Sequence, residues 1–150
     1  MAKDKAVRMV GVDVSARWLD VSRSAADEAP VARQFANTVA GQRQLARWVR
    51  QGKRRARVVL EATGLYSLDV ALELQRTAGV EVMVVNPRAS KEFAGALGQR
   101  ARTDATAAGA LREFAARMPF VPWTPPSPEA LAVRAVMRRV VALIEMRVQE

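Results

Sequence analysis

The order of the apolar patterns is the feature that most constrains the fold of this chain. Three short runs rich in β-branched residues come first, joined by connections too short for a crossover, and they predict an antiparallel meander: Val7–Val14, Trp18–Ser24 and Val31–Asn37. Helix and strand patterns then alternate: Thr38 to about Gln51, Ala56–Glu61, Gly64–Ala78, Val80–Val85 and Arg88–Leu97. This order predicts an α/β fold built on one mixed five-stranded sheet flanked by helices.

Two more helices are predicted after the sheet. The first runs from Asp104 to about Met118, and the second is an amphipathic helix over Glu129–Glu150 with an apolar stripe at Val133, Val136, Val140 and Ile144. Five of the seven prolines fall between them, within residues 119–128. We therefore expect a domain over 1–118, a Pro-rich linker over 119–128, and a helical, coiled-coil-like segment over 129–150 that continues in a longer protein. The element order as a whole is that of the ribonuclease-H-like fold.

The composition restricts the chemistry open to this chain. It contains no Cys and no His, which excludes disulfides, thiolate nucleophiles, Cys/His zinc sites and a histidine base. A metal ion would have to be a hard cation held by carboxylates. Neither a signal peptide nor an apolar run long enough to span a membrane is present, so we expect a cytoplasmic protein.

The positive charge lies mainly in the first part of the chain. Residues 1–60 hold 13 Lys and Arg against five Asp and Glu, whereas residues 61–150 hold 11 against 10, within a net charge of +9. Such a field attracts phosphate backbones, although a solvated basic surface is the simpler alternative. The candidate nucleic-acid contacts in this cluster are Arg47, Arg50, Lys53, Arg54 and Arg55.

Three carboxylates fall at the ends of predicted elements. Asp13 closes the first strand, Glu61 closes the fourth, and Asp104 opens the late helix. In the predicted sheet the first and fourth strands are neighbours, so Asp13 and Glu61 would emerge side by side with Asp104 near them. Mg²⁺ or Mn²⁺, as one or two ions, would neutralise such a cluster and support phosphodiester cleavage. Taken singly, each residue also suits a turn or a helix start.

The motifs around these carboxylates resemble a known family. Gly11-Val12-Asp13-Val14-Ser15, Leu60-Glu61-Ala62-Thr63-Gly64, Val85-Asn86-Pro87 and Arg102-Thr103-Asp104 are similar to the N-terminal domain of DEDD-type insertion-sequence transposases. These are RuvC-like recombinases that include the Piv invertases and the bridge-RNA-guided recombinases. The resemblance covers about residues 8–118. It implies a catalytic domain that cleaves DNA strands during transposition, with Mg²⁺ held by Asp, Glu, Asp and Asp. It also implies DNA and a structured guide RNA as partners.

The chain departs from that family pattern in two ways. The fourth carboxylate position, three residues after Asp104, is Ala107. The family's C-terminal domain, which contributes a serine nucleophile, has no counterpart in this sequence. We therefore expect impaired cleavage by this chain, with Asp13, Glu61 and Asp104 as the remaining metal ligands and catalytic residues. The helix over 129–150 is expected to pair with a second copy.

Several other residues have competing interpretations. Arg88 and Lys91 follow Asn86-Pro87, and Arg100 and Arg102 precede Asp104, so these four are candidate phosphate contacts beside the metals. Trp18, Trp48 and Trp123 are expected to pack in the core or the linker rather than to stack on bases.

Alternative functions remain at this point. One is a non-enzymatic nucleic-acid-binding remnant, which Ala107 favours, and another is a Holliday-junction resolvase, which shares the fold and the metals. A sugar-kinase-like phosphotransferase also opens with Gly-x-Asp, but it needs a second lobe that 150 residues cannot hold. Tyr66 as a tyrosine-recombinase nucleophile is disfavoured because the chain has no His.

Overall fold

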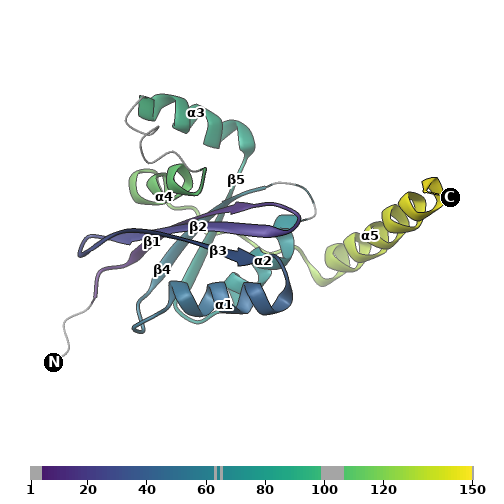
Figure 1. Cartoon of the computed structure of the whole chain (residues 1–150), viewed down its shortest axis with the longest axis horizontal. Helices are drawn as coiled ribbons and strands as arrows, with labels where there is room; N and C mark the ends of the chain where they lie inside the picture. Colours follow the sequence, from purple (N-terminus) through teal and green to yellow (C-terminus); the bar gives the residue numbers. More distant parts are fainter. Residues whose placement is uncertain (1–4, 63, 65, 99–106, 150) are drawn as a thin grey trace.

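The computed structural model describes residues 5–62, 64, 66–98 and 107–149. A single five-stranded sheet has the order β3-β2-β1-β4-β5 (Figure 1). Its strands are β1 (Arg8–Val14), β2 (Trp18–Ala25), β3 (Glu28–Ala36), β4 (Ala56–Glu61) and β5 (Val80–Val85). The strands β1, β2 and β3 are antiparallel neighbours, whereas β4 is parallel to both β1 and β5. The predicted ribonuclease-H-like, mixed five-stranded α/β fold is confirmed.

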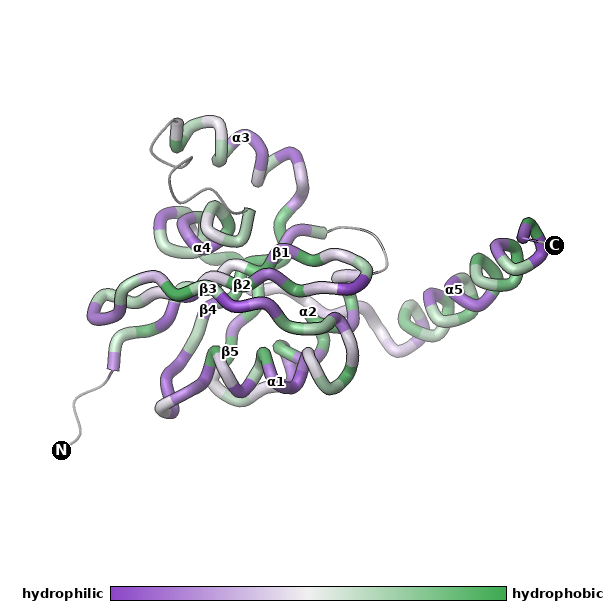
Figure 2. The backbone as a smooth tube through the Cα atoms, viewed as in Figure 1, coloured by the Kyte–Doolittle hydropathy of each residue, from purple (hydrophilic) through white to green (hydrophobic). Residues whose placement is uncertain are grey.

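Helices cover both faces of this sheet (Figure 1). On one face lie α1 (Val39–Val49) and α2 (Tyr66–Arg76), and on the other lies α4 (Ala107–Arg117), with α3 (Pro87–Leu97) packed against α4 through Phe93 and Phe114. Thr38 caps α1 as predicted, because its side chain accepts a hydrogen bond from the Gly41 amide. The apolar strand segments run between these layers (Figure 2).

The two faces have separate cores. Under α1 and α2 the buried side chains include Val10, Val12, Leu19 and Val21, and under α4 they include Val59, Met83 and Val85. Alternate residues of a strand point to opposite faces. Since Leu19 and Val21 face α1, Trp18 and Asp20 face the side of the sheet on which α4 lies.

The third strand begins earlier than the sequence pattern predicts. A strand over residues 31–37 is expected, but β3 begins at Glu28 and includes Pro30. The connection from β2 is a two-residue turn that pairs Ala25 with Glu28 across a register shift. Because β3 is an edge strand, Pro30 can lack a backbone N–H without breaking the sheet.

The Pro-rich segment between α4 and α5 (Pro128–Val148) lies along the free edge of β5. The Trp123 amide donates a 2.7 Å hydrogen bond to the Val82 carbonyl, and the Trp123 side chain packs against the core. Beyond it, α5 extends away from the sheet (Figure 1), and an ion pair of 3.1 Å joins Arg138 to Asp69 of α2. No helix in the described part of the chain is long and apolar enough to cross a membrane.

The expectation that all three tryptophans pack internally is wrong for one of them. Trp48 and Trp123 pack against the core, but Trp18 is 48% exposed. The reason is its position at the first residue of β2, on the face of the hairpin opposite Leu19 and Val21.

Candidate metal centre

Asp13 and Glu61 stand at the same edge of the sheet. Val12 is the register partner of Leu60 in the parallel β1–β4 pair, and each carboxylate is the next residue along its strand. Burial raises the pKa of the Asp13 carboxyl above its usual range, and the charges of Asp20 and Glu61 raise it further. The Glu61 carboxylate, at the end of the neighbouring strand, thus disfavours the ionised form of Asp13.

The first turn of α3 fixes the Glu61 side chain. The Ser90 hydroxyl oxygen lies 2.8 Å from Oε2 of Glu61 and donates a hydrogen bond to it. The same hydroxyl lies 2.9 Å from the Pro87 carbonyl oxygen. Asn86 caps this helix by accepting a hydrogen bond from the Arg88 amide, and Pro87 occupies its start. The Asn-Pro motif therefore brings Ser90 to the end of β4.

A close contact sets the position of α4 over β1. A Cβ atom added to Gly11 would lie 2.0 Å from the Ala108 carbonyl oxygen and 2.4 Å from the backbone nitrogen of Arg112. Only glycine lets the helix backbone lie this close to the strand. Arg112 is buried in the same contact, and its Nη1 donates a 2.6 Å hydrogen bond to the Ser22 hydroxyl of β2.

Ala107, at the start of α4, lines two hollows, and each of them contains one of the strand-end carboxylates. It lines a hollow of about 170 Å³ together with Glu61, Ser90 and Lys91. It also lines an open hollow of about 500 Å³ together with Asp13 and Asp20. A side chain at position 107 thus borders the surroundings of both carboxylates.

Asp20 is a nearby carboxylate that the sequence analysis missed. It is the direct cross-strand partner of Asp13, and its Oδ1 accepts a 3.0 Å hydrogen bond from Nε2 of Gln34 on β3. The signal was present in the sequence, because the alternation of Trp18–Ser24 places Asp20 on the face opposite Leu19 and Val21. Combining this alternation with the hairpin register would have found it.

The carboxylates suit a divalent cation in their chemistry, since they offer hard oxygen donors whose mutual repulsion a cation would relieve. Within the residues that the structure describes, however, no group of three or more such side chains is close enough to hold a metal ion. Asp104, Arg100 and Arg102 lie outside the described residues.

The predicted basic contacts divide into two places. Lys91 lines the Glu61 hollow, and the neighbouring Arg88 is exposed and paired with Glu92 at 3.2 Å. The cluster before β4 lies at the opposite end of that six-residue strand, roughly 20 Å from Glu61 at about 3.3 Å per residue.

Part of this cluster is engaged in structural contacts. Arg54 pairs with Asp27 at 2.6 Å, and Arg50 donates to the Arg54 carbonyl. Arg55 approaches Glu81 at 3.7 Å, while Arg47 and Lys53 are exposed.

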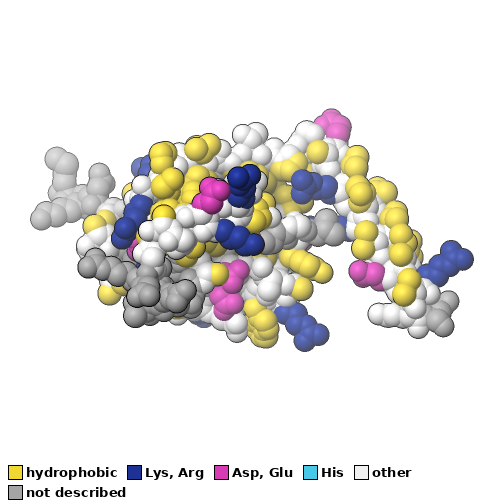
Figure 3. All heavy atoms as spheres, turned by 90° about the horizontal axis from the view of Figure 1, so that it is seen from above, with side chains coloured by type: hydrophobic (Ala, Val, Ile, Leu, Met, Phe, Trp, Pro, Cys, Tyr) yellow, Lys and Arg dark blue, Asp and Glu magenta, His cyan; other side chains and the backbone are white. Residues whose placement is uncertain are grey.

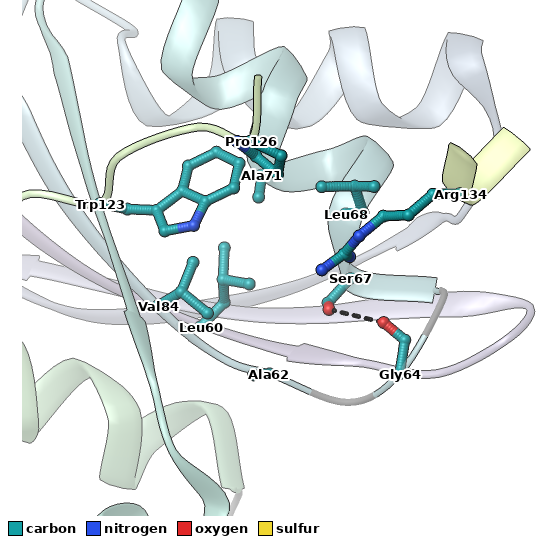
Figure 4. Close-up of a pocket in the computed structure, with 10 residues that line it drawn as sticks. All are labelled: Leu60, Ala62, Gly64, Ser67, Leu68, Ala71, Val84, Trp123, Pro126 and Arg134. Carbon is teal, nitrogen blue, oxygen red and sulfur yellow. Dashed lines mark hydrogen bonds between the residues drawn. The ribbon is translucent and has the colours of Figure 1, made fainter. Parts of the chain in front are cut away.

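A third hollow lies on the α2 side of the sheet. It measures about 440 Å³ and is bounded by Trp123, Leu60 and Ser67, with Arg134 of α5 at its rim (Figure 4). None of the described residues that line it is a carboxylate, which sets it apart from the hollows of Asp13 and Glu61.

Comparison with known proteins decides the family. The sequence model of the DEDD transposases of the IS110 type, described as "Transposase", matches residues 10–150. The chain belongs to this transposase family. No curated protein matches the chain.

Among solved structures, the Aquifex aeolicus member of the Ppx/GppA family is similar at 11% identity with a TM-score of 0.37. The similarity covers 60% of this chain and 38% of the other, so the chain spans less than two thirds of that protein. So distant a similarity adds nothing to the functional argument.

Proposed function

We propose that this chain is the N-terminal catalytic and nucleic-acid-binding domain of a DNA transposase, weakened in metal-dependent strand cleavage by Ala107. Residues 1–118 would form the catalytic domain, 119–128 the linker, and 129–150 the start of a helical segment. The observation that carries the proposal is the position of Ala107, which lines the hollow of Asp13 and that of Glu61. A single acidic side chain there would complete a cluster that suits phosphodiester chemistry.

Asp13, Glu61 and Asp104 would hold Mg²⁺ or Mn²⁺. When bound, such ions supply a polarised water or hydroxyl nucleophile and stabilise the leaving oxygen. The protein's own part is positioning: Ser90 orients Glu61, and Gly11 lets α4 approach the strand ends. Lys91 adds a positive charge beside Glu61, where a DNA phosphate would lie.

A non-enzymatic role is the second candidate, and Ala107 itself favours it. In that case the domain binds nucleic acid, as its charge of +9 supports, without cleaving it. DNA would be the partner in both cases, with a structured guide RNA as a further partner.

One experiment separates the two candidates. Wild type and Ala107→Asp are incubated with a labelled branched DNA and Mn²⁺. The matched control is the double variant that carries Glu61→Gln together with Ala107→Asp. We expect strand nicks with Ala107→Asp, far fewer with wild type, and loss of the gain when Glu61 is replaced. Equal binding by all variants with no nicks from any of them would favour the non-enzymatic role.

We also propose that α5 pairs with a second copy of the chain. Its apolar side chains are exposed rather than packed on the sheet, and hydrophobic groups gather along it (Figure 3). Val136, Val140 and Ile144 are 62%, 48% and 56% exposed and follow at spacings of four residues. A stripe of this kind is typical of a helix that packs against another helix.

A further inference from the structure

We propose that Trp18 is a base-stacking residue, which holds an unpaired nucleotide of the DNA or RNA strand beside the acidic site. This inference rests on the proposed nucleic-acid-binding function and names a contact within it. The starting observation is that Trp18 is 48% exposed, whereas Trp48 is 9% exposed. A large aromatic ring left in solvent loses the benefit of burial unless a ligand covers it.

The position of Trp18 relates it to the acidic site. It precedes Asp20 by two residues on the same face of β2, and Asp20 is the cross-strand partner of Asp13. Same-face neighbours on a strand are about 7 Å apart. A base stacked on the ring would therefore lie within about one nucleotide of Asp13.

The surface around Trp18 is suited to a flat polar ligand. Its cross-strand partner on β3 is Ala36, which is too small to cover the indole. Farther along the same face are Gln34 and Ala32, which line the open hollow with Asp13 and Asp20. This hollow combines carboxylates and Gln34 with small alanines, and an exposed aromatic ring beside it suits a nucleobase, because the base offers both a π-face and hydrogen-bonding edges.

The backbone at this position is held in place before any ligand arrives. The Ser15 hydroxyl donates to the Trp18 carbonyl at 3.0 Å and accepts from the Trp18 amide at 3.1 Å. The Asn37 side chain donates to the Ser15 carbonyl at 2.9 Å. Because these bonds already order the backbone between Ser15 and Trp18, less conformational entropy is lost when a ligand binds there.

Stacking and phosphate contacts respond differently to salt, and this difference provides the test. Loss of a contact that releases no counterions lowers the affinity by the same factor at every salt concentration, so the slope of log K against log salt is unchanged. Binding of a labelled single-stranded oligonucleotide is measured by anisotropy over a salt series in the presence of Mg²⁺. The variants are Trp18→Ala, Trp18→Phe and Val31→Ala, the last being a 47% exposed apolar residue of β3 that serves as the matched control.

We expect Trp18→Ala to weaken binding by about five- to 100-fold without changing the slope. Trp18→Phe should retain most of the affinity, and Val31→Ala should match wild type. An oligonucleotide with abasic sites should bind wild type and Trp18→Ala equally. Thermal unfolding of each variant confirms that the fold is retained.

Two results overturn the inference. If Trp18→Ala binds the oligonucleotide as wild type does, the ring contacts no base. A difference in sedimentation between Trp18→Ala and wild type would then assign Trp18 to a contact between protein chains. If Trp18→Ala weakens binding equally to the abasic strand, the ring does not stack on bases. Failure of the wild type to bind any oligonucleotide would instead overturn the proposed function along with this contact.

Discussion

The Ser90 hydroxyl donates a 2.8 Å hydrogen bond to Oε2 of Glu61, which joins the first turn of α3 to the end of β4. The two residues are 29 positions apart in the sequence. Through this bond the Asn86-Pro87 motif, which starts α3, acts on the orientation of a candidate metal ligand. The Asn86-Pro87 motif thus has a structural link to the carboxylates, because it starts the helix that carries Ser90 to Glu61.

Replacing Ser90 should weaken metal binding without unfolding the protein. Ser90→Ala removes the bond that orients Glu61, and losing such an outer partner typically costs about 10-fold or more in metal affinity. Mn²⁺ affinity measured by calorimetry checks this. Ser67→Ala is the control, because the Ser67 hydroxyl bonds to the Gly64 carbonyl, away from the carboxylates. Equal affinities in wild type and Ser90→Ala would contradict the role given to Ser90.

Adding one methyl group to Gly11 should displace α4. The new Cβ would meet the Ala108 carbonyl at 2.0 Å, and relieving that overlap should lower the free energy of unfolding by about 1–3 kcal/mol or more. Gly95→Ala in α3 is the control, because nothing lies within 4 Å of its Cβ and a helical alanine should stabilise by about 0.5–1 kcal/mol. Urea unfolding of both variants measures the difference. A neutral Gly11→Ala would mean that α4 lies elsewhere.

The raised pKa of Asp13 predicts how Asp13→Asn responds to pH. Because the pKa of Asp13 is higher in the folded than in the unfolded state, its protonated carboxyl stabilises the fold. This stability is fully present below the unfolded-state pKa and is lost as the pH rises through the folded-state pKa. The ionised carboxylate therefore destabilises the metal-free fold at neutral pH. Asp13→Asn should melt at a higher temperature than wild type at pH 7, and the difference should shrink as the solution becomes acidic.

Asp27→Asn provides a control of opposite sign. Hydrogen bonds from Arg54 lower the pKa of Asp27, so the ionised carboxylate of Asp27 stabilises the fold. This stability is fully present above the unfolded-state pKa and is lost as the pH falls through the lowered folded-state pKa. Asp27→Asn should therefore melt below wild type at pH 7 and approach it in acid. The same sign in both variants would contradict the electrostatic description of Asp13.

Introducing charge on α5 should abolish self-association. Ile144→Glu places a carboxylate in the exposed apolar stripe, where burial against a second helix would leave it unpaired. Sedimentation should show a dimer for wild type and a monomer for Ile144→Glu. Val31→Glu, a change at a similarly exposed residue of β3, should remain dimeric. A monomeric wild type at tens of micromolar would exclude pairing through α5.

The sequence predicts the sheet order and the position of Asp13 and Glu61 at one edge of it, because both follow from strand periodicity and short connections. It misplaces the start of β3, since a proline inside a strand is acceptable only at a sheet edge, and edge position is a tertiary property. The exposure of Trp18 was missed for a similar reason: alternation gives its face, but whether other elements cover that face at the start of β2 is a tertiary property.

The Ser90–Glu61 bond lies further beyond sequence reasoning. It depends on the path of the chain from β5 into α3, which sets a distance between two elements that no local pattern encodes. The Gly11–α4 contact is of the same kind, because the sequence shows a glycine but not the helix that approaches it.

A calorimetric Mn²⁺ titration tests whether Asp13, Glu61 and position 107 border one metal site. The proteins are wild type, Ala107→Asp, Glu61→Gln and the double variant, which together form a thermodynamic cycle. We predict that Ala107→Asp binds Mn²⁺ at least about 10-fold more tightly than wild type, and that Glu61→Gln removes this gain. No gain from Ala107→Asp, or a gain that survives the loss of Glu61, would mean that these residues do not share a metal ion.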